Sequence, residues 1–188
     1  MNTAMLYIHG FNSSPASFKA AAIQRELARR APGAPFLAPA LPPSPAAASR
    51  LLADLARKYP QAALVGSSLG GYYATWMAEK FALRAVLVNP GVRPYDLLVG
   101  EVGRQKNFHT GEEYDFTAQY IEEMRALEID KITPERYLLL VAKGDEVIDY
   151  RHAADRYRGA RQVVIEGSDH SLSDFENYLD TVFAFVGV

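Results

Sequence analysis

One serine stands where a nucleophile would have to be. Residues 66–70 read Gly-Ser-Ser-Leu-Gly, follow the apolar run 62–65 and precede a helical pattern, so Ser68 is the centre of a G-x-S-x-G turn. Between a strand and a helix, this turn holds the serine in a strained conformation with its Oγ exposed above the sheet. A helix N-terminus at the same place also stabilises a developing oxyanion. The pattern predicts acyl transfer through Ser68.

Two other interpretations of this turn are open until its partners are found. A serine ahead of a helix is more often an N-cap than a nucleophile, and G-x-S-x-G also occurs by chance. The glycines at 66, 70 and 71 could instead cradle a phosphate, although the G-x-G-x-x-G and G-K-[ST] patterns are missing. A nucleophile elbow, the tight strand-to-helix turn around Ser68, accounts for Gly66 and Gly70, because a Cβ there would collide with the neighbouring strand or helix.

A nucleophilic serine needs a base to take its proton and a carboxylate to orient that base. In α/β-hydrolases the three follow the chain order serine, acid, histidine. Of the four histidines, His170 lies just beyond the last predicted strand, where ligands and catalytic groups gather in open α/β sheets. His9 and His109 fit the chain order badly, and His152 lies in a helical pattern that favours a solvent-facing position. The sequence therefore predicts His170 as the base.

The acid is predicted at Asp145, which follows the preceding strand at its carboxyl end. Neighbouring parallel strands are about 4.8 Å apart, so the loops of Asp145 and His170 are expected side by side, with the histidine loop leaning two strands across to the nucleophile. Three other aspartates compete for the role: Asp149, Asp169 and Asp174. Asp149 is better interpreted as the N-cap of the next helix, and Asp169 lies too close in sequence to His170 to face its ring.

An oxyanion hole needs two backbone N–H groups aimed at one point. Leu69, directly after the nucleophile, supplies one of them through the construction of the elbow. The second is expected from the loop after the first strand, where the N–H of Phe11 is the natural donor. The His9-Gly10 pair in that loop resembles the His-Gly turn of hydrolases, which favours a structural role for His9.

Strands and helices alternate along the chain. Short apolar, β-rich runs occur at residues 5–8, 35–39, 62–65, 84–88, 137–142 and 162–165. Ser–Pro pairs at 14–15 and 44–45 predict helix starts, and further helices are predicted over 71–81, 117–127, 150–158 and 173–186. This alternation predicts an α/β fold of about six mostly parallel strands with helices on both faces, in one domain spanning residues 1–188.

One connection, residues 90–134, is far longer than the others and carries scattered aromatic side chains. Connections of this length in compact domains are usually lids or binding segments, and a surface excursion covering a sheet edge is the plainer alternative. We expect a lid-like segment in which Phe108 and Phe116 form an apolar pocket wall for acyl chains. Arg93, near its start, could meet an anionic substrate or form a buried ion pair.

Composition narrows the classes of function. The chain has 188 residues, 49% of them hydrophobic, and a net charge of −2 from 20 basic and 22 acidic residues. No basic stripe is visible, so nucleic acid is not an expected partner. The absence of cysteine excludes a disulfide, a thiolate metal site and a cysteine nucleophile, and we expect neither metal nor cofactor. No apolar run nears the roughly 18 residues of a membrane span, and the first residues do not look like a signal peptide, so a cytoplasmic protein is expected.

Together these motifs resemble those of the YqiA-like bacterial esterases, small α/β-hydrolases without a large cap. The shared strings are His-Gly-Phe-Asn-Ser-Ser-Pro at residues 9–15, Leu-Pro-Pro at 41–43, Gly-Ser-Ser-Leu-Gly-Gly-Tyr-Tyr-Ala-Thr at 66–75, Asn-Pro-Gly-Val-Arg-Pro at 89–94, Thr-Gly at 110–111, Gly-Asp-Glu-Val at 144–147 and Ile-Glu-Gly-Ser-Asp-His at 165–170. The resemblance implies hydrolysis of carboxylic esters, and admits acyl-CoA thioesters, with Ser68, Asp145 and His170 as the triad. It also implies a minimal hydrolase fold that lacks the usual first two strands.

Several substrate classes fit this reading of the sequence. A small-molecule acyl ester or thioester is the expected partner. The same fold and triad could serve a peptidase or a carbon–carbon hydrolase. A hydrolase fold could also act as a catalytically silent binding module, which the filled triad positions disfavour.

Overall fold

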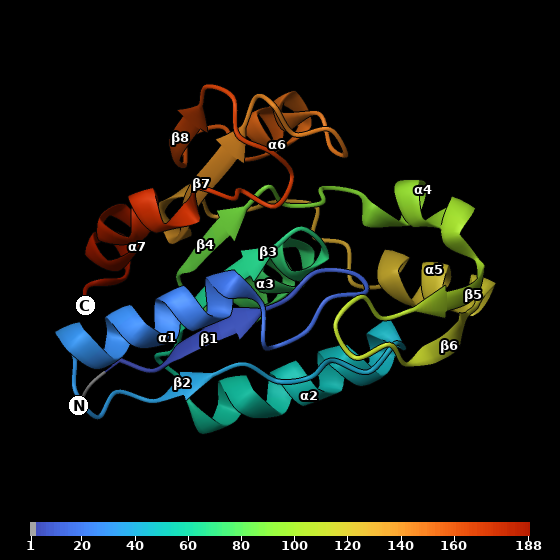
Figure 1. Ribbon diagram of the computed structural model, residues 1–188, viewed down its shortest axis with the longest axis horizontal. Coiled ribbons are helices and arrows are strands. Elements are labelled where there is room, and N and C mark those ends of the chain that lie inside the picture. Colours follow the sequence, from blue (N-terminus) through green and yellow to red (C-terminus); the bar gives the residue numbers. More distant parts are fainter. Residues whose placement is uncertain (1–2) are drawn as a thin grey trace.

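The centre of the molecule is a parallel β-sheet (Figure 1). The computed structural model describes residues 3–188. The central sheet has six strands: β1 (Met5–Ile8), β2 (Phe36–Leu37), β3 (Ala63–Ser67), β4 (Ala85–Val88), β7 (Tyr137–Ala142) and β8 (Arg161–Ile165). Their spatial order is β2-β1-β3-β4-β7-β8, and every neighbouring pair is parallel. The predicted strands are confirmed, and the elbow strand β3 lies two strands from β7.

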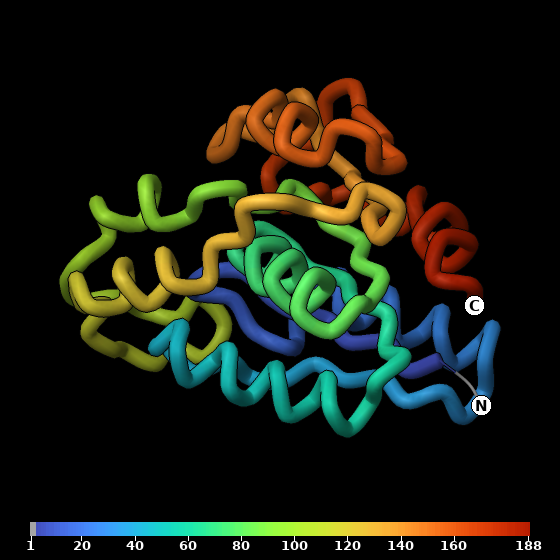
Figure 2. Tube along the Cα trace, turned by 180° about the vertical axis from the view of Figure 1, so that it is seen from behind, coloured from blue at the N-terminus to red at the C-terminus, as the bar shows by residue number. Residues whose placement is uncertain are grey.

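Helices cover both faces of this sheet. The helices α1 (Phe18–Arg30) and α7 (Leu179–Val186) pack on the face turned to the viewer in Figure 1. The helices α2 (Pro45–Lys58), α3 (Leu69–Phe81) and α6 (Tyr150–Arg156) pack on the opposite face, which Figure 2 shows from behind. Parallel strands require such crossover connections, and right-handed crossovers place the helices on the two faces.

Strand β7 shows why the central strands are apolar throughout. All of its residues are buried. Leu138 and Leu140 belong to the core beneath α1 and α7, whereas Leu139 and Val141 belong to the core beneath α2, α3 and α6. Burying one such side chain contributes roughly 1.5–3 kcal/mol. A polar residue on either face would therefore be costly, which explains the uniformly apolar run.

The start of α1 differs from the prediction. The Ser–Pro pair at residues 14–15 predicts a helix from this point, but α1 begins at Phe18. The serine of that pair closes only a local turn. Ser17 is the actual N-cap, and its hydroxyl donates to the hydroxyl of Tyr7 on β1. The contact with the sheet, rather than the local Ser–Pro signal, fixes where the helix begins.

The other predicted helices are confirmed with changes in length. Helix α2 begins at Pro45 behind the N-cap Ser44, as expected. The helix predicted over 173–186 is divided into a 3-10 turn, Phe175–Tyr178, and α7. Helix α5 (Ala118–Arg125) lies within the range predicted for it.

The long connection between β4 and β7 contains a hairpin that the sequence did not indicate. It comprises α4 (Pro94–Leu98), a 3-10 turn (Val99–Glu101), the antiparallel strands β5 (Gly103–Lys106) and β6 (Glu113–Phe116), then α5 and a second 3-10 turn (Pro134–Arg136). The hairpin lies beyond the carboxyl ends of the central strands (Figure 1), where the Asn12 amide binds the side chains of Gln105 and Tyr114. Most side chains of β5 and β6 are exposed and polar, so they lack an apolar strand pattern.

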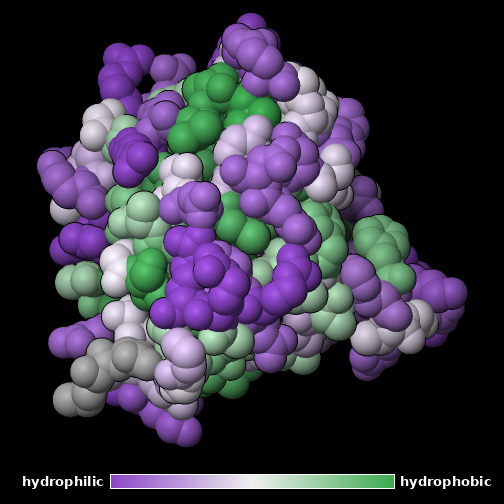
Figure 3. Space-filling view, turned by 60° about the vertical axis from the view of Figure 1, so that its left-hand side comes forward, coloured by the Kyte–Doolittle hydropathy of each residue, from purple (hydrophilic) through white to green (hydrophobic). Residues whose placement is uncertain are grey.

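The surface mixes polar and apolar side chains. On the face shown in Figure 3, hydrophilic residues separate several apolar patches. Within residues 3–188, no helix combines the length and the hydropathy that crossing a bilayer would require.

Candidate active site

The turn at Ser68 has the strained geometry that the sequence predicts. Ser68 has φ 54° and ψ −120°, a region that non-glycine residues adopt only when the surrounding structure enforces it. A Cβ on Gly66 would lie 2.3 Å from the carbonyl oxygen of Gly70, and a Cβ on Gly70 would lie 1.9 Å from the carbonyl oxygen of Ile8. Only glycine fits at these two positions, so the spacing of the motif is a steric requirement of the turn between β3 and α3.

Backbone hydrogen bonds attach this turn to the neighbouring strand. The Ser68 N–H donates to the carbonyl of Val88 on β4 at 3.0 Å, and the Ser68 carbonyl accepts from the N–H of Gly91 at 3.1 Å. The serine side chain is half-buried at the carboxyl edge of the sheet. It also stands at the N-terminus of α3, where the first N–H groups of a helix have no intrahelical acceptor.

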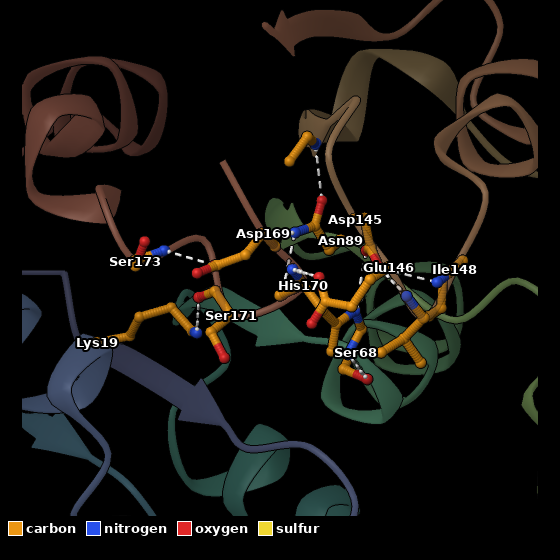
Figure 4. A network of polar contacts seen from close by, with 12 residues as sticks. Lys19, Ser68, Asn89, Asp145, Glu146, Ile148, Asp169, His170, Ser171 and Ser173 are labelled. Atoms are coloured by element: carbon orange, nitrogen blue, oxygen red, sulfur yellow. Dashed lines mark hydrogen bonds and ion pairs between the residues drawn. The ribbon is translucent and has the colours of Figure 1, made fainter. Parts of the chain in front are cut away.

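Ser68, His170 and Asp145 form a continuous hydrogen-bonded relay (Figure 4). The Ser68 Oγ lies 3.0 Å from His170 Nε2, and His170 Nδ1 lies 3.0 and 2.8 Å from the two carboxylate oxygens of Asp145. Because a carboxylate only accepts, Nδ1 carries the ring proton and Nε2 is left to accept from the serine hydroxyl. The structure thus brings together the three residues that the sequence predicts for the site.

The carboxylate of Asp145 is buried and hydrogen-bonded on several sides. Its side chain is 1% exposed, and Oδ1 also accepts from the N–H groups of Val147 and Ile148, both at 2.8 Å. Burial alone would raise the pKa of Asp145, but the hydrogen bonds from His170 and from these two N–H groups outweigh it and hold the pKa below its usual range. The group is therefore ionised at neutral pH and fixes the orientation of the imidazole.

The loop that carries His170 is held by side chains from two neighbouring strand ends (Figure 4). Asn89, at the end of β4, donates to the carbonyls of Asp169 and His170, at 3.0 Å each. The same amide accepts from the N–H of Ala142 on β7 at 2.9 Å. Glu146 accepts from the His170 N–H at 3.0 Å. These bonds fix the backbone from which the imidazole projects.

Sequence reasoning missed three residues around this loop. They are Asn89, Glu146 and Lys19, the last of which donates to the carbonyl of Ser171. Asn89 directly follows an apolar strand, and Glu146 directly follows the predicted acid, so the rule that functional groups gather at carboxyl strand ends could have found both. The signal for Lys19 is a charge on the apolar face of a helix, four residues before the buried Ile23.

The competing aspartates have other partners. Asp149 is the N-cap of α6, as predicted. Asp169 accepts from a backbone N–H four residues further on, and Asp174 accepts from the hydroxyl of Ser168. All three carboxylates therefore have other hydrogen-bond partners, and the carboxylate that contacts the His170 imidazole is that of Asp145.

The other three histidines have different surroundings. His9 is buried, with Nδ1 donating to the Gly10 carbonyl at 2.9 Å and Nε2 accepting from the Leu41 N–H at 3.2 Å. Desolvation lowers the pKa of His9, which keeps the ring neutral. Both nitrogens therefore serve the loop structure, as predicted, while His109 and His152 are exposed.

The loop after β1 approaches Ser68 closely. A Cβ on Gly10 would lie 3.2 Å from the Ser68 Cβ and 3.3 Å from the carbonyl oxygen of Ser67. Phe11 directly follows this glycine, and Leu69 directly follows Ser68. The two backbone segments predicted to supply an oxyanion hole therefore border the serine side chain.

A cleft of about 400 Å³ opens beside Ser68 and His170, and Phe108 lines it. Phe108 is 81% exposed, so it stands at the open side of this cleft. Phe116 is 3% exposed and packs edge-to-face on Phe11, with ring centroids 5.2 Å apart. It lines a smaller cavity of about 110 Å³ together with Phe11 and Leu69. The two predicted wall residues, Phe108 and Phe116, thus line two different cavities.

Arg93 lies outside the cleft at Ser68. Its side chain is 60% exposed and pairs with Asp96 at 3.1 Å, so the predicted ion pair exists but is not buried. Arg93 lines a separate depression with Ile148 and His152. In the described part of the chain, no three His, Asp or Glu side chains are clustered so as to hold a metal ion.

The chain matches one protein family over nearly its whole length. The model of UPF0227, described as an uncharacterised protein family, matches residues 4–187. The chain belongs to this family. Curated members include the UPF0227 protein YcfP of Salmonella paratyphi A and a UPF0227 protein of Serratia proteamaculans, each 24% identical over 123 residues. These matches span 65% of this chain and 63% of each relative's length. The resemblance to YqiA-like proteins is confirmed.

Solved structures share the fold. A putative hydrolase from Agrobacterium vitis has a TM-score of 0.77 at 17% identity, over 98% of this chain and 88% of that one. Est1E from Butyrivibrio proteoclasticus has a TM-score of 0.71 at 16% identity, over 98% and 86%. Alpha/beta hydrolase domain-containing protein 10 from mouse has a TM-score of 0.71 at 16% identity, over 96% and 89%. The α/β-hydrolase fold predicted from the sequence is confirmed.

Proposed function

We propose that this UPF0227 protein is a serine hydrolase that cleaves carboxylic esters through an acyl-enzyme intermediate. The observation that carries the proposal is the relay from Ser68 through His170 to Asp145, whose bond lengths suit proton transfer. A capping role explains Ser68 poorly, because within the described chain its side chain makes no capping hydrogen bond to α3. A strained serine hydrogen-bonded to an imidazole nitrogen is instead the arrangement of an activated nucleophile.

Acylation begins when His170 Nε2 takes the Ser68 Oγ proton and Oγ forms a bond to the ester carbonyl carbon. The carbonyl oxygen becomes an oxyanion, for which the N–H groups of Phe11 and Leu69 are the proposed donors. The carboxylate of Asp145 stabilises the imidazolium without taking its proton. The carbon–oxygen bond to the alcohol then breaks, and the alcohol leaves with the proton from Nε2. Ser68 retains the acyl group.

Deacylation repeats these steps with water as the nucleophile. Water gives a proton to His170 Nε2 and attacks the acyl carbon, and the tetrahedral intermediate collapses with return of the proton to Ser68 Oγ. The carboxylic acid is released. The overall reaction consumes one ester and one water and yields one acid and one alcohol, so it requires no oxidant or reductant.

The names of proteins with the same fold support an ester as the substrate. Est1E from Butyrivibrio proteoclasticus has been solved with ferulic acid bound, LipS and LipT are described as lipolytic enzymes, and the protein from Paleococcus ferrophilus is described as a monoacylglycerol lipase. The same attack by Ser68 would also cleave an acyl thioester. A thioesterase is therefore a second form of the same proposal.

A substrate panel tests the proposal. The protein and its Ser68→Ala variant are assayed on p-nitrophenyl esters from acetyl to dodecanoyl, on matching thioesters and on peptide amides. We expect ester turnover by the wild type and a loss in kcat on the order of 10⁴-fold or more in Ser68→Ala, at an unchanged melting temperature. An inactive wild type would point to a silent binding module, and turnover of amides alone would point to a peptidase.

A further inference from the structure

The cleft beside Ser68 contains a buried lysine. Lys19, in the first turn of α1, is 5% exposed and lines the same cleft as Ser68 and His170. Lysine side chains are almost never buried to this degree unless their charge is paired. Burying an unpaired ammonium is costly, so its position calls for a partner.

Groups of the protein satisfy only part of the hydrogen-bonding capacity of the Lys19 ammonium. An ammonium has three N–H donors, and within residues 3–188 the hydrogen-bond acceptor of Lys19 is the carbonyl of Ser171, as Figure 4 shows. The carboxylate of Asp169 attracts the ammonium electrostatically but forms no ion pair with it in this part of the chain. The ring of Phe18 lies 4.6 Å from Nζ and adds a cation–π contact. Hydrogen-bonding capacity is therefore left over beside the nucleophile.

The surroundings of Lys19 suit a small polar group. The same cleft is lined by the hydroxyl-bearing residues Tyr7, Ser17 and Ser67, and the Tyr7 hydroxyl accepts from that of Ser17. Desolvation lowers the pKa of Lys19 to about 8, with Asp169 opposing the shift. The ammonium is thus mostly charged at neutral pH. It lines the same cleft as these hydroxyl groups, and it binds the carbonyl of Ser171, the residue after His170.

We infer that Lys19 binds a negatively charged group of the substrate, so that the preferred esters carry a carboxylate a few carbons from the scissile bond. This inference rests on the proposed ester hydrolysis. A substrate carboxylate would pair the buried ammonium and form charge-assisted hydrogen bonds with it, which are stronger than neutral ones. Neutral esters would leave the ammonium unpaired, and the difference would appear as selectivity for the anion.

A purely structural role for Lys19 makes a different prediction. If the lysine only holds the loop of His170 through the Ser171 carbonyl, its loss would lower the turnover of charged and neutral esters equally. Lys19→Gln separates the two roles, because an amide can still donate to that carbonyl but carries no charge. Lys19→Met removes both the donor and the charge. Lys58→Met, at the exposed end of α2, is the matched control.

The test compares hemiesters of succinate, glutarate and adipate with the corresponding neutral diesters, for the wild type and the three variants. A second arm places the carboxylate on the alcohol side of the ester. We expect the wild type and Lys58→Met to prefer the anion in one arm, with an optimum spacer length. In Lys19→Gln the ratio of kcat/KM for charged over neutral ester should fall roughly 10–100-fold, because the loss on the charged ester exceeds any loss on the neutral one.

The pH dependence gives an independent readout. The wild-type preference for the anion should decline as the pH rises through about 8, where Lys19 loses its charge, and Lys19→Gln should show no such decline. The other ionisable groups around the cleft are Asp169, His170, His109 and Tyr7, and they are present in both proteins. The difference between the two profiles therefore reports on Lys19 alone.

Three results would overturn the inference. They are a wild type without preference for the anion in either arm, an equal loss on charged and neutral esters in Lys19→Gln, and a preference that survives this variant. A wild type that hydrolyses neutral esters without preferring charged ones contradicts the inference while leaving the proposed function intact. A wild type inactive on every ester contradicts both.

Discussion

The carboxyl ends of the central strands and the hairpin of β5 and β6 differ in how their side chains are held. At the strand ends, the Asp145 carboxylate accepts three N–H groups, and the Asn89 amide makes three hydrogen bonds in the interior of the protein. In the hairpin region most side chains face solvent, and Phe108 stands at the open side of the cleft. The strand ends are fixed by buried hydrogen bonds, whereas the hairpin is fixed by its own strand pairing and by hydrogen bonds to the loop after β1.

This difference separates chemistry from selection of substrate. The relay depends on β3, β4, β7 and β8, whose parallel pairing sets the spacing of Ser68, Asp145 and His170. The hairpin contributes Phe108 to the cleft and no member of the relay. We therefore expect substitutions at the strand ends to lower kcat for every ester, and substitutions in the hairpin to change which ester is preferred.

The largest effect is expected at the base. His170→Ala removes the proton acceptor of Ser68 and should abolish measurable turnover, whereas His152→Ala on the exposed face of α6 should barely change it. The check is kcat/KM for the three proteins. Comparable losses in both variants would remove His170 from its assigned role.

A loss on the order of 10⁴-fold in kcat is expected for Asp145→Asn, because an amide would not hold the Nδ1–H tautomer of His170. The substitution should also act on stability. The pKa of Asp145 is depressed in the folded protein, so its stabilisation is present above the unfolded-state value of about 3.9 and is lost as the pH falls below it.

Melting temperatures at neutral and acid pH check this second effect. The variant should melt below the wild type at neutral pH, and the gap should narrow toward pH values under about 4. Retained turnover in Asp145→Asn would return Asp149 and Asp174 to consideration as the acid.

A smaller effect is expected at Asn89, which positions the loop of His170 without touching a substrate. Asn89→Asp preserves an acceptor for the Ala142 N–H but removes the donor to two carbonyls. We expect kcat to fall roughly 10–100-fold with KM nearly unchanged, since a small displacement of the base is costly. Asn177→Asp is the control, because Asn177 is exposed on the 3-10 turn Phe175–Tyr178. A rise in KM with unchanged kcat would place Asn89 in substrate binding instead.

The smallest effects on ester turnover are expected in and beneath the hairpin. Phe108→Ala should shift kcat/KM between short and longer acyl esters by a few-fold, because each methylene removed from water contributes roughly 0.8 kcal/mol. The melting temperature of Phe108→Ala should be unchanged, because this side chain is exposed. Phe116→Ala should instead destabilise the protein by about 3–5 kcal/mol, because the ring is buried against Phe11. A chain-length profile that neither variant alters would reduce the connection 90–134 to a structural cover.

The same contrast explains how much the sequence could predict. The buried strands and the elbow have strong local signals, since uniformly apolar runs and glycines at 66 and 70 follow from steric and solvation requirements that act on each residue. The rules for parallel sheets also predicted that the loops of Asp145 and His170 are neighbours, and in the structure these loops follow the adjacent strands β7 and β8.

The missed features depend on contacts between distant segments. The start of α1 is set by a bond from Ser17 to Tyr7, and the hairpin is attached to the β1 loop through Asn12. Neither contact leaves a pattern in the local sequence. For Arg93 the sequence left an anionic substrate and a buried ion pair open, since its position in the sequence could not show that it pairs with Asp96 at the surface.

The central claim is that Ser68 is the nucleophile, and the most direct measurement is the site of covalent modification by a fluorophosphonate. In this reaction the serine Oγ forms a bond to phosphorus and fluoride leaves, so intact mass and peptide mapping locate the adduct. The account predicts one adduct per chain on Ser68, none on Ser68→Ala, and strongly slowed labelling in His170→Ala. An adduct on the adjacent Ser67, or labelling of Ser68→Ala at the wild-type rate, would contradict it.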